Sequence, residues 1–114
     1  MPKISSMSYK VKTIPKFEKK LKRLAKKYPS LKDEFVKLIE SLKENPLQGT
    51  PLGNDCFKIR IGISSKGKGK SGGARVITYV QIVQTSVYLL TIFDKSEKEN
   101  IPDKELQELL KMLI

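Results

Sequence analysis

The spacing of apolar residues changes several times along the first half of the chain. Residues 9–12 alternate apolar and charged side chains, as a short strand with one buried face does. Between Pro15 and Tyr28, and again between residues 31 and 42, apolar residues recur every three or four positions. Pro29 and Pro46 follow the two stripes, and Ser30 and Asp33 have the spacing of a capping box. We therefore expect a strand followed by a hairpin of two amphipathic helices.

The second half has the composition of strands. β-Branched and aromatic residues are enriched at 57–63, 75–82 and 87–93, and only a short polar turn separates the last two segments. Residues 48–55 are rich in turn formers and predict a loop. Leucines at 106, 109, 110 and 113 predict a final helix, for which Asn100 is the expected N-cap. The pattern predicts one α+β domain over residues 1–114, in which an antiparallel three-strand meander completes a four-stranded sheet.

Charge and cysteine content narrow the classes of function. The 114 residues include 23 Lys and Arg but 12 Asp and Glu, and the net charge of +11 favours a polyanionic partner. Histidine is absent and Cys56 is the single cysteine, so neither an intramolecular disulfide nor a Cys/His zinc site is expected. Cys56 itself is expected to be a small buried residue. The sequence has no apolar run of membrane-spanning length and no secretion signal, so we expect a cytoplasmic protein. We also expect no cofactor.

Basic residues gather in the predicted meander. Because side chains alternate along a strand, Lys58 and Arg60 share the face opposite to Ile59. A glycine-rich loop follows and carries three further lysines that can approach phosphate: Lys66, Lys68 and Lys70. The loop lacks the residue order of a P-loop and precedes a strand instead of a helix, which argues against nucleotide hydrolysis. A solvated strand face and a loop without a partner remain the alternative interpretations.

Two more cations are expected near this strand. Arg75 enters the next strand directly after the glycine-rich loop, so a hairpin would bring it beside Lys58 and Arg60. Lys95 follows the last strand and would close the patch, although an exposed lysine at a strand end fits the spacing equally well.

Residues 57–101 resemble the RelE superfamily of bacterial toxins, and the resemblance is closest to its HigB-like branch. Four segments carry it: Phe-Lys-Ile-Arg at 57–60, Lys-Gly-Lys-Gly-Lys-Ser-Gly-Gly-Ala-Arg at 66–75, Thr-Tyr at 78–79, and Leu-Leu-Thr-Ile-Phe-Asp-Lys at 89–95. The glycine-lysine-arginine segment is the most specific of the four. The helical half agrees with the family in order and length but carries no specific motif.

The resemblance implies a RelE-like fold whose concave sheet face cuts RNA. It also implies that Lys58, Arg60, Arg75 and Lys95 occupy positions where the family keeps basic residues. Some members carry a tyrosine near the start of the last helix and others use histidine, whereas residues 100–102 here are Asn-Ile-Pro. The general base is therefore not identified by the resemblance. Our candidate is Lys58, because neighbouring cations disfavour the charged form of a lysine.

These points predict the toxin of a type II toxin-antitoxin system, acting as a metal-independent endoribonuclease on messenger RNA at the ribosomal A site. The RNA 2′-hydroxyl would attack the adjacent phosphorus, giving a 2′,3′-cyclic phosphate and a 5′-hydroxyl. Arg75 would stabilise the transition-state phosphate with help from Arg60 and Lys95. The lysines of the glycine-rich loop would contact RNA. The expected partners are messenger RNA, the ribosome and a cognate antitoxin protein.

Two other functions are compatible with the same sequence. ParE-like toxins share the scaffold and poison DNA gyrase without cutting RNA, so the fold cannot separate them from nucleases. A non-catalytic module that binds RNA or the ribosome would also be basic. The cluster of Lys58, Arg60 and Arg75 on one expected face favours RNA cleavage over both.

Overall fold

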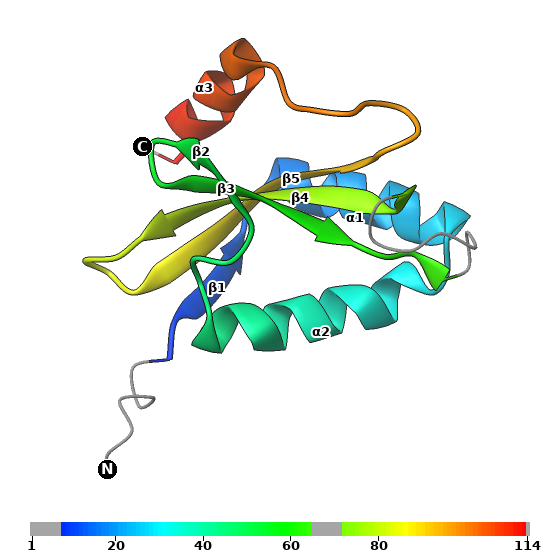
Figure 1. Cartoon of the computed structure of the whole chain (residues 1–114), viewed down its shortest axis with the longest axis horizontal. Coiled ribbons are helices and arrows are strands. Elements are labelled where there is room, and N and C mark those ends of the chain that lie inside the picture. Colours follow the sequence, from blue (N-terminus) through cyan, green and yellow to red (C-terminus); the bar gives the residue numbers. More distant parts are fainter. Residues whose placement is uncertain (1–7, 65–71, 114) are drawn as a thin grey trace.

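Five strands form one mixed sheet with helices on both of its faces (Figure 1). The computed structural model describes residues 8–64 and 72–113. In sheet order the strands are β1 (Lys10–Thr13), β5 (Ser86–Asp94), β4 (Ala74–Gln81), β3 (Cys56–Ile61) and β2 (Thr50–Gly53). β1 runs parallel to β5, and every other neighbouring pair is antiparallel. The helices are α1 (Pro15–Lys27), α2 (Leu31–Glu44) and α3 (Asp103–Lys111). The predicted α+β fold is confirmed.

The helical hairpin covers one face of the sheet and α3 lies on the other (Figure 1). The apolar stripes of α1 and α2 supply buried residues such as Phe17 and Leu42, which belong to the same core as the strand residues Val76 and Leu89. Leu109 of α3 is also fully buried. α3 lies beside Tyr79 of β4. The helix covers only part of the sheet face on which it lies. The remainder of that face is available for a site.

The prediction of a four-stranded sheet was one strand short. Thr50–Gly53 forms the edge strand β2, whereas residues 48–55 were expected to be a loop. Proline is tolerated there because an edge strand pairs on one side only. Gly49 precedes the strand at a φ of 103°, and a Cβ at this position would lie 2.6 Å from the carbonyl oxygen of Lys58. Gly49 therefore allows the chain to approach β3 closely.

The helix caps also differ from the prediction. Pro102 is the N-cap of α3, and no side chain caps that helix. The Asn100 side chain instead accepts a hydrogen bond from Lys58 Nζ at 2.8 Å. Ser30 is the N-cap residue of α2 as expected, but its side chain makes no capping hydrogen bond. Within the described ranges, no helix has the length and apolar character needed to cross a membrane.

Candidate active site

The register of β3 and β4 brings three basic residues to the same face of the sheet. Arg60 lies directly opposite Arg75, and Lys58 lies opposite Ile77 two residues further along β4. Opposed residues of an antiparallel pair project from the same face. β3 presents Lys58 and Arg60 on this face because its alternate residues, including Ile59 and Ile61, are buried in the core.

Lys95 reaches this face from the segment that connects β5 to α3, residues 95–102. Its backbone N–H donates to the carbonyl oxygen of Gly73 at 3.0 Å, which fixes the start of this β5–α3 segment beside the start of β4. Glycine at position 73 also lets the chain pass close to the end of β3, since a Cβ there would lie 2.1 Å from the carbonyl oxygen of Ile61. The contact places Lys95 next to the entry of Arg75 into the sheet.

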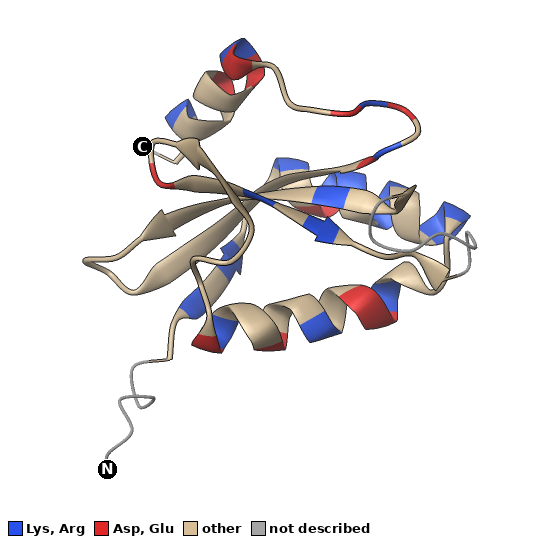
Figure 2. Ribbon diagram, in the orientation of Figure 1, with Lys and Arg blue, Asp and Glu red and all other residues tan. Residues whose placement is uncertain are grey.

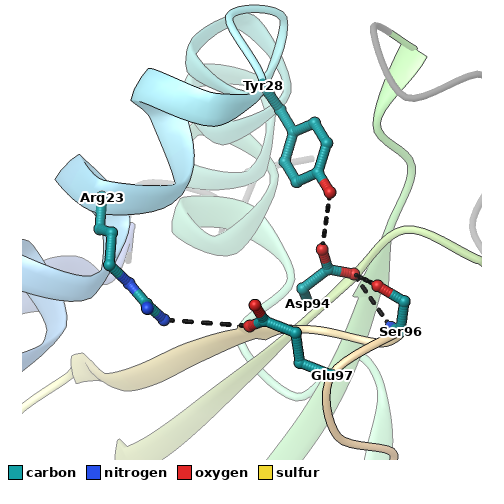
Figure 3. Close-up of polar contacts among 5 residues, drawn as sticks. All are labelled: Arg23, Tyr28, Asp94, Ser96 and Glu97. Carbon is teal, nitrogen blue, oxygen red and sulfur yellow. Dashed lines mark hydrogen bonds and ion pairs between the residues drawn. The ribbon is translucent and has the colours of Figure 1, made fainter.

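A buried carboxylate organises the first turn of the β5–α3 segment (Figure 3). Asp94 is fully buried, and its Oδ1 accepts hydrogen bonds from the backbone N and the Oγ of Ser96 at 2.9 and 2.8 Å. Its Oδ2 accepts one from the hydroxyl of Tyr28, at the end of α1, at 2.9 Å. Arg23 and Glu97 form a looser ion pair at 3.9 Å on the exposed surface. The helical hairpin thus holds the segment that carries Lys95.

The far end of the β5–α3 segment is held by two further contacts. Lys98 Nζ lies 2.6 Å from Glu105 Oε1 of α3, in a partly buried ion pair. Lys58 reaches from β3 to Asn100, as described above. Because both ends are fixed, the segment lies over the open part of the sheet beside α3. Figure 2 shows lysine and arginine on β3, β4 and this segment.

β3, β4 and the β5–α3 segment enclose a polar pocket of about 290 Å³. It is lined by Lys58, Arg60, Arg75, Lys95, Glu99 and Asn100. All four residues predicted as catalytic therefore lie in one pocket, although their roles stay predictions. Lys66, Lys68 and Lys70 lie outside the described residues.

Arg75 lies at the base of the pocket, and only 3% of its surface is exposed. Its Nη1 donates to the carbonyl oxygen of Ala74 at 3.3 Å. Burial lowers the pKa of Arg75, and the positive charge of Arg60 lowers it further, whereas Glu99 acts in the opposite direction. An arginine nevertheless stays protonated in proteins. Arg60 and Arg75 repel each other across the two strands, which destabilises the sheet. A bound phosphate would offset that repulsion, so the arrangement suits an anion site.

Two pocket residues were not identified in the sequence. Glu99 and Asn100 belong to a polar stretch that shows no periodicity, and Asn100 was assigned to a helix cap instead. The acidic and polar character of residues 96–100 was the available signal, but it does not indicate a direction toward the basic strands. Among the described residues, no group of three His, Cys, Asp or Glu side chains is arranged to bind a metal ion.

Cys56 lies in the core, as expected. The side chain is fully buried, and burial raises the pKa of its thiol to about 11, with a smaller contribution from Asp55. A thiol with this pKa is a poor nucleophile at neutral pH. Cys56 is therefore a structural residue on the first position of β3.

The fold and this pocket together define a class: small α+β proteins that hold a preorganised cluster of cations on a partly open sheet. Residues 13–113 match the family model described as RelE toxin of the RelE/RelB toxin-antitoxin system. The match spans most of the chain, and the protein belongs to this family of toxins.

Solved structures agree with the family at the level of the fold. A double arginine mutant of the Escherichia coli toxin RelE in the free state is similar with a TM-score of 0.64 at 16% identity, covering 94% of this chain and 99% of that one. The toxin-antitoxin complex RelBE2 of Mycobacterium tuberculosis is similar with a TM-score of 0.57 at 20% identity, covering 76% of this chain and 98% of that one. At these identities the likeness establishes the shared fold only.

Proposed function

We propose that this protein is a ribosome-dependent endoribonuclease that inhibits translation by cutting messenger RNA in the A site. The observation that carries the proposal is the convergence of Lys58, Arg60, Arg75 and Lys95 on one polar pocket. A phosphodiester in that pocket would meet fixed positive charge from two strands and from the β5–α3 segment. Membership of the RelE toxin family supports the toxin role.

The reaction that we propose uses the 2′-hydroxyl of the RNA itself as the nucleophile. The RNA 2′-hydroxyl attacks the adjacent phosphorus, the bond from phosphorus to O5′ breaks, and the products are a 2′,3′-cyclic phosphate and a free 5′-hydroxyl. Negative charge grows on the phosphorus oxygens in the transition state. Arg75 neutralises this charge, with Arg60 and Lys95 beside it, and one preorganised donor of this kind is typically worth roughly 10² to 10³ in rate. The reaction uses these fixed cations and no metal ion.

Two partners accompany this function. We assign Lys66, Lys68 and Lys70 to the backbone of the substrate or of ribosomal RNA, because lysines bind phosphate without regard to sequence. The M. tuberculosis neighbour is a toxin-antitoxin complex, which supports a cognate antitoxin for this chain as well. That antitoxin would cover the basic face or block entry into the ribosome. The proposed substrate implies action in the bacterial cytoplasm.

The chemistry is tested with a messenger that carries one 2′-deoxynucleotide at a mapped cut site. Because the 2′-hydroxyl is the nucleophile, cleavage should stop at that position and continue at unmodified sites, and the upstream product should end in a cyclic phosphate. Equal cleavage of the deoxy position would contradict this mechanism. A supercoiling assay with purified gyrase is the companion experiment: inhibition of gyrase together with an intact messenger would indicate a ParE-like poison instead.

A further inference from the structure

Glu99 is the one acidic side chain that lines the pocket in the described part of the chain. It extends from the β5–α3 segment over strands that supply Lys58, Arg60 and Arg75. It is close enough to act electrostatically on Arg75, in opposition to Arg60. A carboxylate in a site for RNA phosphate weakens binding of the substrate, because like charges repel. Its position in the pocket therefore calls for a chemical role.

We propose that Glu99 is the general base that removes the proton from the attacking 2′-hydroxyl. This inference rests on the proposed ribonuclease function and adds the group that the sequence left undefined. An ionised carboxylate is an acceptor of hydrogen bonds and of protons, whereas lysine must first lose a proton before it can accept one. Glu99 is thus a better candidate for the base than Lys58, to which the sequence-based hypothesis gave this role.

The surroundings of Glu99 suit such a proton transfer. The Lys58–Asn100 hydrogen bond at 2.8 Å fixes the residue next to Glu99 against β3, and the Lys98–Glu105 ion pair at 2.6 Å fixes the residue before it against α3. Glu99 is therefore held between two anchored neighbours, over the cations that would bind the phosphate. A base must lie within hydrogen-bond reach of the proton it removes when the substrate is bound, and Glu99 lines the same pocket as the cations that would hold the phosphate.

The step balances without a further reactant. As the bond from O2′ to phosphorus forms, the 2′-hydroxyl proton moves to a carboxylate oxygen of Glu99. As the bond from phosphorus to O5′ breaks, the leaving oxygen takes a proton from the ammonium group of Lys58. Exchange with water then returns the proton from Glu99 to solvent and restores Lys58. Arg75 stays charged throughout.

The test compares Glu99→Gln with Glu97→Gln, which removes an equal charge from the exposed surface of the same segment. Single-turnover cleavage of a messenger on purified ribosomes gives the rate, and anisotropy with a 2′-O-methyl RNA gives the affinity. Loss of a general base should lower the rate of Glu99→Gln by roughly 10² to 10⁴, while its affinity for RNA stays equal or increases. Glu97→Gln should cut within about twofold of the native rate, as surface substitutions do.

A second variant separates a chemical role of Glu99 from a structural one. Glu99→Asp should keep measurable cleavage, because it retains a carboxylate.

The outcomes distinguish the two proposals. If the native chain leaves the messenger intact, the ribonuclease function fails, and the assignment of Glu99 fails with it. If the native chain cuts and Glu99→Gln cuts at the same rate, only the assignment of Glu99 is overturned. The assignment is supported if Glu99→Gln loses much of the cleavage rate while its affinity for RNA is equal or higher and its thermal unfolding temperature is unchanged.

Discussion

Replacing Tyr28 with Phe removes a single hydroxyl from the contact between α1 and the end of β5. That hydroxyl donates to Asp94 Oδ2 at 2.9 Å, and Asp94 is fully buried. A hydrogen bond to a charged group contributes about 1.5 to 3 kcal/mol, and a buried acceptor that loses its donor cannot recover this energy from bulk water. We expect Tyr28→Phe to lower the free energy of unfolding by about this amount, or roughly ten- to a hundredfold in the folding equilibrium.

The assay is urea unfolding followed by circular dichroism, with Tyr88→Phe as the matched control. Tyr88 packs its ring 6.2 Å from that of Tyr79, and its hydroxyl has no hydrogen-bond partner within the described residues. The free energy of unfolding of the control should therefore lie within about 0.5 kcal/mol of that of the native chain. If both variants unfold at the same urea concentration, the Tyr28–Asp94 contact does not stabilise the segment as we have argued.

Three further predictions concern charge and burial. Arg60→Gln removes a like-charge pair across two strands, so urea unfolding should show a gain of roughly 0.2 to 1 kcal/mol while cleavage falls; a loss of stability would contradict the repulsion. Burial raises the pKa of the Cys56 thiol to about 11, which keeps the thiol protonated at neutral pH. A thiol reagent should therefore label Cys56 only after unfolding, and fast labelling of the native chain would refute this prediction. Changing Lys66, Lys68 and Lys70 to Gln should reduce the slope of log binding constant against log salt concentration by about two units, with a smaller effect on turnover. An unchanged slope would show that these lysines do not contact the RNA.

Much of the fold follows from local sequence periodicity. The stripes of α1 and α2 and the β-rich segments of the meander are regular enough to be read without a structure, and strand alternation correctly put Lys58 and Arg60 on one face. β2 was not predicted, because an edge strand tolerates Pro51 and Gly53, which otherwise indicate a loop. Its pairing with β3 depends on contacts that no local pattern encodes.

The pocket depends on contacts between distant parts of the chain. Lys58 and Asn100 are 42 positions apart, and Tyr28 and Asp94 are 66 apart. These contacts decide where the β5–α3 segment lies, and hence that Glu99 enters the pocket. The residues of that segment have no period of their own, so their sequence could not indicate which of them faces the cations.

The most direct test of the central claim is translation of a defined messenger in a purified system, followed by primer extension. The native chain should produce discrete cuts in the A-site codon when ribosomes are present and none when they are omitted. Arg75→Ala, which removes the buried cation of the pocket, should lower the rate of cutting by roughly 10² to 10³. An intact messenger and full-length product with the native chain would contradict the account.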